Sequence, residues 1–368
     1  MGFRSYGLRD AARRHNLAIG CAIGYDMLQK ETSMSVVEGE FGVVVFENEM
    51  KLGSYFIPST EHPGQGKFDW HRLDALVEYA CGRGLAIRGH TLVWHQGQPD
   101  LSRWELDYCG WEQFLVSYIT AVVTRYRGRI QHYDVVNEAL TDDGKHRGFR
   151  DSFWFQRLGP DYVQIAFRAA RAADPYAKLY YNDYSVEVTG PKSDMVFSFL
   201  LDLRKRGVPV DGIGFQTHLA EFPFGQEQLY TKNFHRWRSA GFEMSITEMD
   251  VPLAGNPGPG FRTTEETRAA IYRQFVEWAI EYEFAGFLVW GLDDGGSWIN
   301  YHQHIFPGGK DPLLFDKDLR KKASYHAVME ALSQTKSRCQ NRENVLIGGR
   351  DRAPTIIDRR RPQRLKLI

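Results

Sequence analysis

The sequence contains few cysteines, no long apolar run and no surplus of either charge. Its four cysteines, Cys21, Cys81, Cys109 and Cys339, form no CxxC pair and no cysteine–histidine spacing typical of a metal site. Three pairings of the four are possible, and free thiols remain an alternative. No window approaches the length of a membrane span, and no apolar segment follows the basic N-terminal residues, so we predict neither a span nor a signal peptide. The compartment stays open: the protein is either cytoplasmic or exported with a leader outside this sequence.

Charge gives no reason to expect a polyanionic partner. Lysine and arginine together number 46 of the 368 residues, and so do aspartate and glutamate. The distribution is uneven, because residues 336–368 hold ten basic and three acidic residues, which leaves residues 1–335 net acidic. An acidic body with a basic tail suits a neutral substrate better than nucleic acid. The tail lacks periodicity, so we expect an extended or disordered segment, with an arm that contacts a polyanion, a membrane surface or another protein as the alternative.

Cofactor and metal motifs are also missing. No GxGxxG follows the first predicted strand, and the sequence has no GxSxG elbow, P-loop or zinc ribbon. His90 and His95 are five residues apart, and His302 and His304 are two apart, but neither pair has an acidic or cysteine partner at the usual spacing. We therefore predict no cofactor and no catalytic metal.

The sequence does contain a regular alternation of short apolar runs and longer amphipathic ones. We predict eight strands, at residues 17–23, 42–46, 85–91, 132–137, 178–182, 212–216, 243–248 and 286–290. Helical patterns cover residues 69–84, 111–128, 153–173, 191–206, 226–240, 264–283 and 323–333. This α/β alternation predicts a single-domain (β/α)8 or TIM barrel over residues 1–335, followed by the basic extension at 336–368; an open doubly wound sheet is the alternative. The stretch GNPGPG at 255–260 predicts a loop after the seventh strand.

Most of the predicted strands end in a polar or aromatic side chain. In a TIM barrel the carboxyl ends of all strands meet on one face, which is where active sites lie. The side chains at these ends are Glu47 and Asn48, His90, Asn137 and Glu138, Asn182 and Asp183, Gln216 and His218, Glu248, and Trp290. One such group is often an accident of a strand's exit, but seven ends that open into one bowl predict a functional site.

Two carboxylates among these side chains have the placement that glycoside cleavage needs. Glu138 and Glu248 follow the fourth and seventh strands, so they face each other across the bowl. A protonated carboxyl donates to the leaving oxygen, and the other attacks the anomeric carbon if the two lie about 5 Å apart, or activates a water if they are farther apart. His218 is a candidate hydrogen-bond donor to Glu248, and Asp250 is placed to hold His218.

Motifs around these residues resemble those of glycoside hydrolase family 10, the retaining endo-β-1,4-xylanases. The matching stretches span roughly residues 8 to 333 in the order of the family; they are FENEMK (46–51), RGHTLVWH (88–95), DVVNEA (134–139), YNDY (181–184), GFQTH (214–218), ITEMD (246–250), VWGLDDGGSW (289–298) and PLLFD (312–316). Each alone is weak evidence, but together they are highly specific. The resemblance implies a monomeric enzyme that acts on a polysaccharide or oligosaccharide of the xylan type, without metal or cofactor.

The resemblance also implies a role for each matching residue. Glu138 is expected to be the acid/base and Glu248 the nucleophile, with His218 hydrogen-bonded to the nucleophile and Asp250 supporting it. The expected substrate contacts are Asn137 at the 2-hydroxyl of the cleaved sugar, Glu47, Asn48 and Lys51 at the next sugar on the non-reducing side, His90 and Trp94 along the cleaved sugar, Tyr184 and Gln216 for positioning, and Trp290 and Trp298 over the sugar on the non-reducing side.

Three departures from the family's pattern leave the glycan open. Leu52 follows Lys51 where the family often has tryptophan, Gly97 stands where glutamine is common while Gln96 comes one position earlier, and Ser185 replaces an asparagine. A xylan backbone, a mixed-linkage β-glucan and an exopolysaccharide all offer the required β-1,4 bond. There are therefore two alternatives to a xylanase. One is a hydrolase that acts on another β-linked glucan or exopolysaccharide during polysaccharide assembly or trimming. The other is a non-catalytic carbohydrate-binding barrel.

Overall fold

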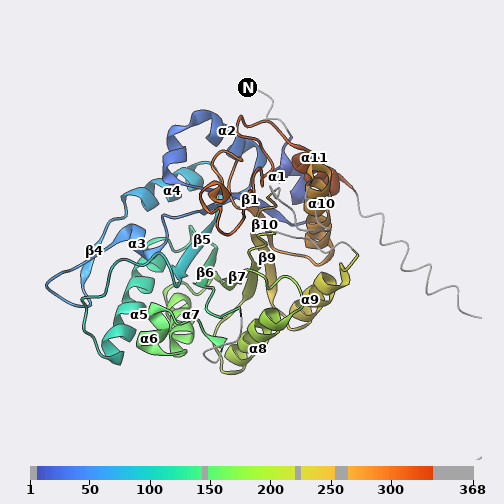
Figure 1. Cartoon of the computed structure of the whole chain (residues 1–368). Coiled ribbons are helices and arrows are strands. Elements are labelled where there is room, and N and C mark those ends of the chain that lie inside the picture. The colour runs from blue at the N-terminus through green and yellow to red at the C-terminus, as the bar shows by residue number, and fades with distance from the viewer. Residues whose placement is uncertain (1–5, 143–147, 220–224, 253–263, 335–368) are drawn as a thin grey trace, which may run out of the picture. The chain divides into compact units, whose positions relative to one another are not determined.

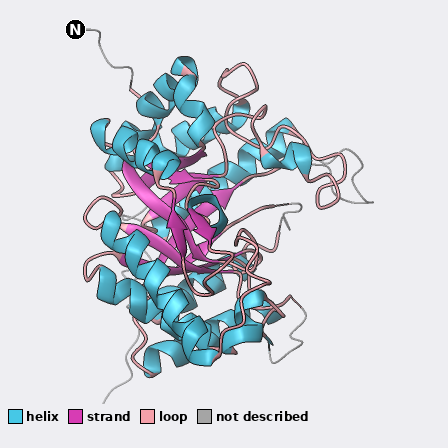
Figure 2. Ribbon diagram, turned by 90° about the vertical axis from the view of Figure 1, so that its left-hand side faces the viewer, coloured by secondary structure: helices cyan, strands magenta, loops and turns pink. Residues whose placement is uncertain are grey.

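Eight parallel strands close into a barrel in the computed structural model, which describes residues 6–142, 148–219, 225–252 and 264–334. Around the barrel the strand order is β1-β2-β5-β6-β7-β8-β9-β10, and β10 pairs with β1 to close the ring. Figures 1 and 2 show the strands at the centre with the helices packed around the outside. The predicted (β/α)8 barrel is confirmed, and the open doubly wound sheet is excluded by the closure.

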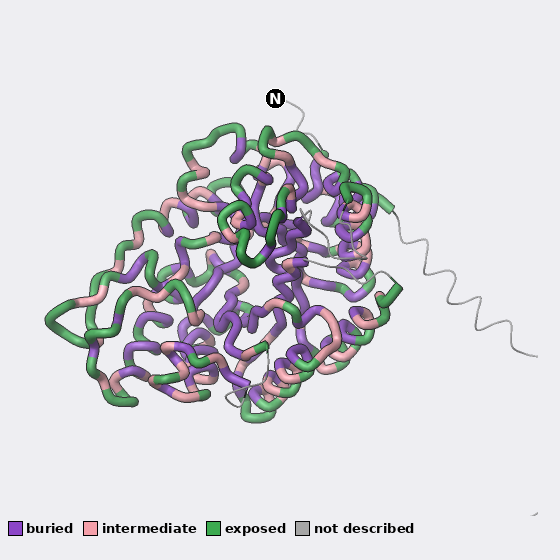
Figure 3. Tube along the Cα trace, viewed as in Figure 1, coloured by how far each residue is buried: buried purple, intermediate pink, exposed green. Residues whose placement is uncertain are grey.

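All eight predicted strands form. Their bounds are β1 Ala18–Ile23, β2 Val43–Phe46, β5 Ala86–Val93, β6 His132–Asn137, β7 Lys178–Asp183, β8 Gly212–Phe215, β9 Glu243–Met249 and β10 Gly286–Val289. Nearly every strand residue is buried, as expected for parallel strands covered by helices outside and by packed side chains within. In Figure 3 the buried residues gather along the barrel, and the exposed ones lie mainly around the periphery and on a loop in the middle of the view.

The helices that cover the barrel fall where the apolar periodicity predicts them, with one exception. Their bounds are α4 His71–Gly82, α5 Tyr108–Arg125, α6 Phe153–Leu158, α7 Asp161–Ala173, α8 Pro191–Lys205, α9 Gln228–Ser239, α10 Glu265–Glu281 and α11 Ala323–Ser333. The single helix predicted over 153–173 is wrong, because α6 and α7 are separate. Gly159 ends α6 at φ 56°, and Pro160, which has no amide hydrogen, starts α7.

Several short elements were not predicted from the sequence. They are α1 Leu8–Arg13, the 3-10 helix Tyr25–Gln29, α2 Glu31–Glu40, α3 Leu52–Tyr55, the antiparallel pair β3 Phe56–Pro58 and β4 Gly66–Phe68, and the 3-10 helix Trp298–Tyr301. Most have fewer residues than the two turns that a helical period needs to be recognised. The β3–β4 pair lies outside the barrel, in the connection between β2 and α4.

Irregular pairing occurs towards the carboxyl ends of the strands, where the site lies. The register shifts between His90 and Val93 on β5, between Asp134 and Val136 on β6, and between Phe287 and Val289 on β10. Bulges of this kind redirect side chains locally without breaking the sheet.

Parts of the sequence-based interpretation fall outside the described residues. The stretch 255–260 and the tail 336–368, with Cys339, are among them, so the loop and the irregular extension stay predictions, as does the domain boundary at residue 335. Within the described residues Cys21, Cys81 and Cys109 are unpaired, and Cys21 is buried. No helix in the described part of the chain is long and apolar enough to cross a membrane.

Candidate active site

The two glutamates singled out in the sequence lie at the same face of the barrel. Glu138 directly follows β6, and Glu248 lies near the end of β9; the two side chains are largely buried. Glu138 adopts φ 54° and Thr217, between Gln216 and His218, adopts φ 63°. Residues with a side chain rarely adopt this left-handed region, and such strain is concentrated at functional sites.

Glu248 is surrounded by groups that favour its charged form. Asn182 Nδ2 donates to Glu248 Oε1 at 2.7 Å, and His218 Nε2 lies 3.2 Å from Oε2. His90 Nδ1 lies 3.7 Å from Oε1. Burial opposes ionisation of this carboxyl, but the attraction of His90 and the hydrogen bond and charge of His218 outweigh it, so the pKa of Glu248 lies below its usual range.

His218 carries its proton because two carboxylates flank it. Burial disfavours the charged imidazole, but Asp250, whose Oδ2 lies 3.0 Å from His218 Nδ1, and Glu248 on the other side together raise the pKa of His218 to about 10. Asp250 is itself fully buried, and its Oδ2 also accepts a hydrogen bond from Trp298 Nε1 at 2.7 Å. The expected support of His218 by Asp250 is thus present in the geometry.

Glu138 has a different set of neighbours. Its Oε1 accepts hydrogen bonds from Asn137 Nδ2 at 3.1 Å and from Gln216 Nε2 at 2.8 Å, and both donors are neutral amides. His95 Nδ1 lies 3.6 Å from Oε2. Burial lowers the pKa of His95, despite the opposing charge of Glu138, so this imidazole is neutral at neutral pH.

Asn182 joins the two glutamates into one network. Its Nδ2 donates to Glu248 Oε1 and, at 2.9 Å, to Asn137 Oδ1, while its Oδ1 accepts from Thr247 Oγ1 at 2.7 Å. Gln216 Nε2 reaches the same Asn137 Oδ1 at 3.2 Å. The sequence placed Asn182 at a strand end but assigned it no role, because nothing in the motif says that its amide binds both Glu248 and Asn137, the residue that in turn donates to Glu138.

The buried ion pair behind His90 was also missed. Asp134 on β6 lies 3.1 Å from His90 Nδ1 and accepts both a 3.1 Å hydrogen bond from Arg88 Nε and a second one from the same guanidinium. Burial opposes its charge, but Arg88 and His90 keep the pKa of Asp134 below its usual range. His90 is therefore held by one carboxylate while it faces another, and the alternating residues of two inner strands gave no sequence signal for this pairing.

Aromatic rings close over the two histidines. The Trp290 ring packs edge-on against His90 at 5.1 Å between centroids, and Trp298 packs against His218 at 4.9 Å. Both tryptophans were predicted to cover a sugar, and the structure places them beside the Glu248 side of the network. They give that side a flat apolar wall of the kind that stacks on sugar rings.

Glu47, Asn48 and Lys51, predicted to contact the next sugar, follow β2, and Trp94, predicted to line the cleaved sugar, follows β5. Lys51 Nζ donates to Asn48 Oδ1 at 2.9 Å and lies 4.9 Å from the centroid of the Trp94 ring. The charge of Lys51 also acts on Glu47, although burial dominates and raises the pKa of that carboxyl. Through Lys51 these four residues lie together, and we refer to them as the Lys51 wall; their contacts with sugar stay predictions.

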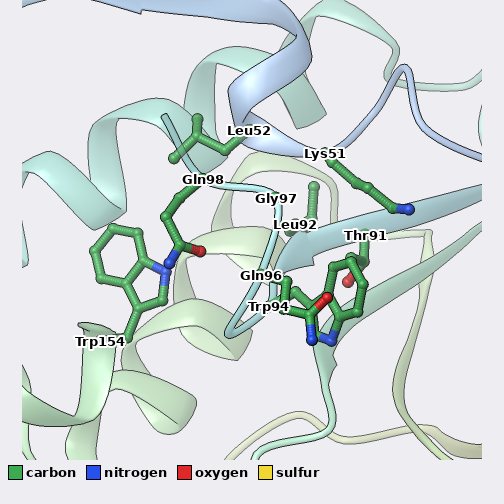
Figure 4. A pocket seen from close by; sticks show the side chains of 9 residues that line it. All are labelled: Lys51, Leu52, Thr91, Leu92, Trp94, Gln96, Gly97, Gln98 and Trp154. Carbon is green, nitrogen blue, oxygen red and sulfur yellow. The ribbon is translucent and has the colours of Figure 1, made fainter. Parts of the chain in front are cut away.

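A pocket opens in this wall where the sequence departs from the family's pattern. Figure 4 shows its lining, which is Lys51, Leu52, Thr91, Leu92, Trp94, Gln96, Gly97, Gln98 and Trp154. Lys51 points its ammonium group away from Leu52 in this view. Gly97 has φ 70° and lies against Lys51, and its carbonyl accepts a 2.7 Å hydrogen bond from the Gly53 amide. The departures at Leu52, Gln96 and Gly97 are thus neighbours in space.

Tyr184 is connected to Glu138 through one intervening residue. Its hydroxyl donates to Asp142 Oδ2 at 2.7 Å and accepts from Arg150, whose Nε in turn donates to the carbonyl oxygen of Glu138 at 3.0 Å. Tyr184 is thus linked to the Glu138 backbone through Arg150, a residue that the sequence did not single out, and its positioning role stays a prediction.

The histidine pairs weighed as metal ligands serve other purposes. His90 faces Glu248 and His95 faces Glu138, and the rings of His302 and His304 are 5.7 Å apart. Among the described residues no group of three or more histidine, cysteine, aspartate or glutamate side chains could hold a metal. What this arrangement offers is two buried carboxylates in contrasting electrostatic settings, with amide donors and aromatic walls between them.

A (β/α)8 barrel with paired glutamates after strands β6 and β9 defines the class as a glycoside hydrolase of the TIM-barrel type. A sequence model described as Glycosyl hydrolase family 10 matches residues 7–331. The chain therefore belongs to glycosyl hydrolase family 10, and it is a glycoside hydrolase.

Relatives and solved structures agree with this assignment. The chain is 33% identical to endo-1,4-beta-xylanase B of Thermotoga neapolitana, over 90% of this chain and 93% of that protein. It is 31% identical to endo-1,4-beta-xylanase 1 of Gibberella zeae, over 82% and 84% of the two chains. The structure of xylanase 10B from Thermotoga petrophila, in complex with xylobiose, superposes with a TM-score of 0.80 at 31% identity, over 90% of this chain and 98% of that one.

Proposed function

We propose that the protein is a retaining endo-β-1,4-glycanase that hydrolyses xylan, with Glu138 as acid/base and Glu248 as nucleophile. The observation that carries the proposal is the contrast between the two carboxylates. Glu248 lies against a protonated His218 and has a lowered pKa, whereas Glu138 accepts from the neutral amides of Asn137 and Gln216. A carboxylate held charged beside a cation, opposite a second carboxyl that meets neutral amide donors, is an arrangement that suits a nucleophile and an acid/base. The xylanases among the relatives support xylan as the polymer.

The first half of the proposed reaction forms a covalent intermediate. Glu248 attacks the anomeric carbon while Glu138 gives its proton to the leaving glycosidic oxygen, so that one sugar chain departs and the other is esterified to Glu248. Asn182 and His218 hold the attacking carboxylate in place. Asn137 donates to Glu138 and is linked to Glu248 through Asn182, and we assign its amide to the 2-hydroxyl of the cleaved sugar.

The second half restores the enzyme. Glu138, now deprotonated, takes a proton from a water molecule, which attacks the anomeric carbon and breaks the ester to Glu248. Two inversions give net retention of configuration. Trp290 and Trp298 cover the sugar on the non-reducing side, and Glu47, Asn48 and Lys51 bind the next unit, while His90 and Trp94 line the cleaved one.

The test compares the intact enzyme with Glu248→Gln on xylan, mixed-linkage β-glucan and cellulose, with new reducing ends as the measurement. We expect release from xylan, a loss of at least about 10⁴-fold in the variant, and products that first appear in the β-configuration by NMR. Glu243→Gln is the matched control, because Glu243 begins the same strand at the opposite end of the barrel and pairs with Lys178. Activity of Glu248→Gln near that of the control would refute the assignment.

A second candidate substrate is a β-linked glucan, and the pocket beside Lys51 favours it. Leu52 and Gly97 line that pocket in place of larger side chains common in the family. Release from mixed-linkage β-glucan but not from xylan would keep the mechanism and change the polymer.

A further inference from the structure

The backbone around Glu138 is held at four points. Its amide donates to the carbonyl of Asn182 at 2.9 Å, and its carbonyl accepts from Arg150 Nε at 3.0 Å. The next two amides, of Ala139 and Leu140, both donate to the hydroxyl of Tyr181, at 2.9 and 3.3 Å. Because Glu138 has φ 54°, which a residue with a side chain rarely adopts, these bonds are what keeps the turn in this conformation.

The Tyr181 hydroxyl is oriented by a buried aspartate. It donates its proton to Asp183 Oδ2 at 2.8 Å, which leaves its oxygen free to accept from the two amides. Asp183 is fully buried, and its other oxygen accepts from the amide of Tyr184 at 2.9 Å. Burial raises the pKa of Asp183 to about 6, although Lys192 opposes the rise, so a carboxylate at this depth depends on a cation.

That cation is Lys192, in the first turn of α8. Its Nζ lies 2.9 Å from Asp183 Oδ1 and 2.8 Å from Asp142 Oδ1, and 3.3 Å from the centroid of the Tyr184 ring. Only 7% of its side chain is exposed. A buried ammonium held by a buried carboxylate is costly to disrupt, because removal of one partner leaves the other uncompensated.

We propose that Lys192 is a positioning residue for Glu138. It fixes Asp183, Asp183 orients the Tyr181 hydroxyl, and that hydroxyl holds the turn that aims the Glu138 carboxyl at the leaving oxygen. The proposal rests on the proposed function, in which Glu138 is the acid. Glu248 shares Asn182 with the Glu138 turn but is also held by His90 and His218, so a disturbance at Lys192 affects proton transfer far more than nucleophilic attack.

The test uses leaving groups that differ in their need for a proton. Phenyl β-xylobioside requires acid assistance, whereas 2,4-dinitrophenyl β-xylobioside does not. For Lys192→Met and for Tyr181→Phe we expect kcat/KM to fall about tenfold or more on the phenyl substrate and less than about threefold on the dinitrophenyl substrate. Lys192→Arg, which keeps the charge, is expected to recover part of the loss. Circular dichroism and thermal melting establish that each variant is folded at the assay temperature.

Lys178→Met is the matched control, because Lys178 begins strand β7, is half exposed, and pairs with Glu243 at 3.7 Å on the far side of the barrel. Lys178→Met should leave kcat/KM unchanged on both substrates. Equal losses on the two substrates in Lys192→Met and Tyr181→Phe, or no loss on either, would overturn the proposal.

Glu138→Ala, assayed in parallel, separates this inference from the proposed function. A loss confined to the phenyl substrate in Glu138→Ala, but absent in Lys192→Met and Tyr181→Phe, removes the positioning role and leaves the acid/base assignment intact. The absence of leaving-group dependence in Glu138→Ala removes that assignment, and the positioning role with it.

Discussion

The surroundings of Glu138 and Glu248 use the same kinds of side chain to opposite effect. Each glutamate has an imidazole near it, His95 at 3.6 Å from Glu138 and His218 at 3.2 Å from Glu248. The pKa of His95 is lowered, chiefly by burial, whereas the pKa of His218 is raised to about 10 because Asp250 and Glu248 outweigh burial. One carboxylate therefore faces a neutral ring and the other a cation.

The contact behind each histidine explains this difference. Asp250 Oδ2 lies 3.0 Å from His218 Nδ1, so the ring is bracketed by two carboxylates. Behind His95, the amide nitrogen of Gln96 lies 3.1 Å from Nε2. An amide nitrogen only donates, which suits a neutral ring with its proton on the nitrogen that faces Glu138. The comparison shows that His218 is charged because a second carboxylate lies behind it, whereas His95 has a neutral amide in the corresponding place.

The largest effect that tests the comparison comes from removal of each glutamate. Glu138→Ala should lower kcat/KM about 10²- to 10⁴-fold on phenyl β-xylobioside, and by less than about tenfold on the 2,4-dinitrophenyl substrate, because only the first needs a proton. Glu248→Ala should abolish hydrolysis of both substrates, since a nucleophile is required whichever group departs. Initial-rate kinetics of the two variants on the two substrates test this expectation. If Glu248→Ala, and not Glu138→Ala, lost activity on the phenyl substrate alone, the acid/base and nucleophile roles would have to be exchanged.

The second effect separates the two histidines. At pH 7, His218→Asn should lower kcat/KM for xylotetraose about 10- to 100-fold, because a hydrogen bond from a charged donor to Glu248 is lost. His95→Asn should cost less than about threefold, since a neutral ring is replaced by a neutral amide. Each of the two histidine variants serves as the control for the other. Equal losses in the two variants would mean that the charge difference between the histidines has no bearing on the reaction.

A smaller effect concerns the pH dependence of stability. Folding raises the pKa of His218 from 6.5 to about 10, so its contribution is fully present below pH 6.5 and is lost as the pH rises towards 10. Asp250→Asn removes the main cause of the shift, so the free energy of unfolding should be lower at pH 6.5 and should fall less steeply up to pH 10.

Denaturant unfolding at the two pH values measures this slope. Asp74→Asn is the control, because the pKa of Asp74 is lowered by its hydrogen bonds to Arg125 and Tyr126, and a lowered carboxyl pKa affects stability only in the acid range. Parallel curves for the intact protein and Asp250→Asn would contradict the coupling of His218 to Asp250.

The smallest effect separates the substrate wall from the glutamates. Gly97→Ala forces a side chain into φ 70° and places its Cβ 3.3 Å from Lys51, so we expect a loss of about 1 kcal/mol in stability and a rise in KM for xylotetraose with kcat within about twofold. Gly128→Ala has the same strain at φ 77° with no atom within 4 Å of the new Cβ. It should lose similar stability without any change in KM; a matching rise in KM would refute the role of the Lys51 contact.

The strand pattern and the motifs anticipated much of this structure. All eight barrel strands were predicted, because a buried parallel strand is a short apolar run and alternates with a helix. The boundary between α6 and α7 at Gly159–Pro160 was missed, since the apolar periodicity continues across it although the helical backbone is interrupted at Gly159. Short elements such as β3 and β4 carry too few residues to show a period.

Within the site, the sequence by itself determined which residues stand at the strand ends, because parallel strands in a barrel deliver their carboxyl ends to one face. Only the tertiary structure decided how these residues pair: that Asn182 binds both Glu248 and Asn137, that His218 lies between Glu248 and Asp250, and that Lys192 reaches Asp183 from the start of helix α8. The physical reason is that a strand end fixes where a side chain begins, whereas hydrogen bonds and pKa values depend on distances of about 3 Å between elements far apart in the chain.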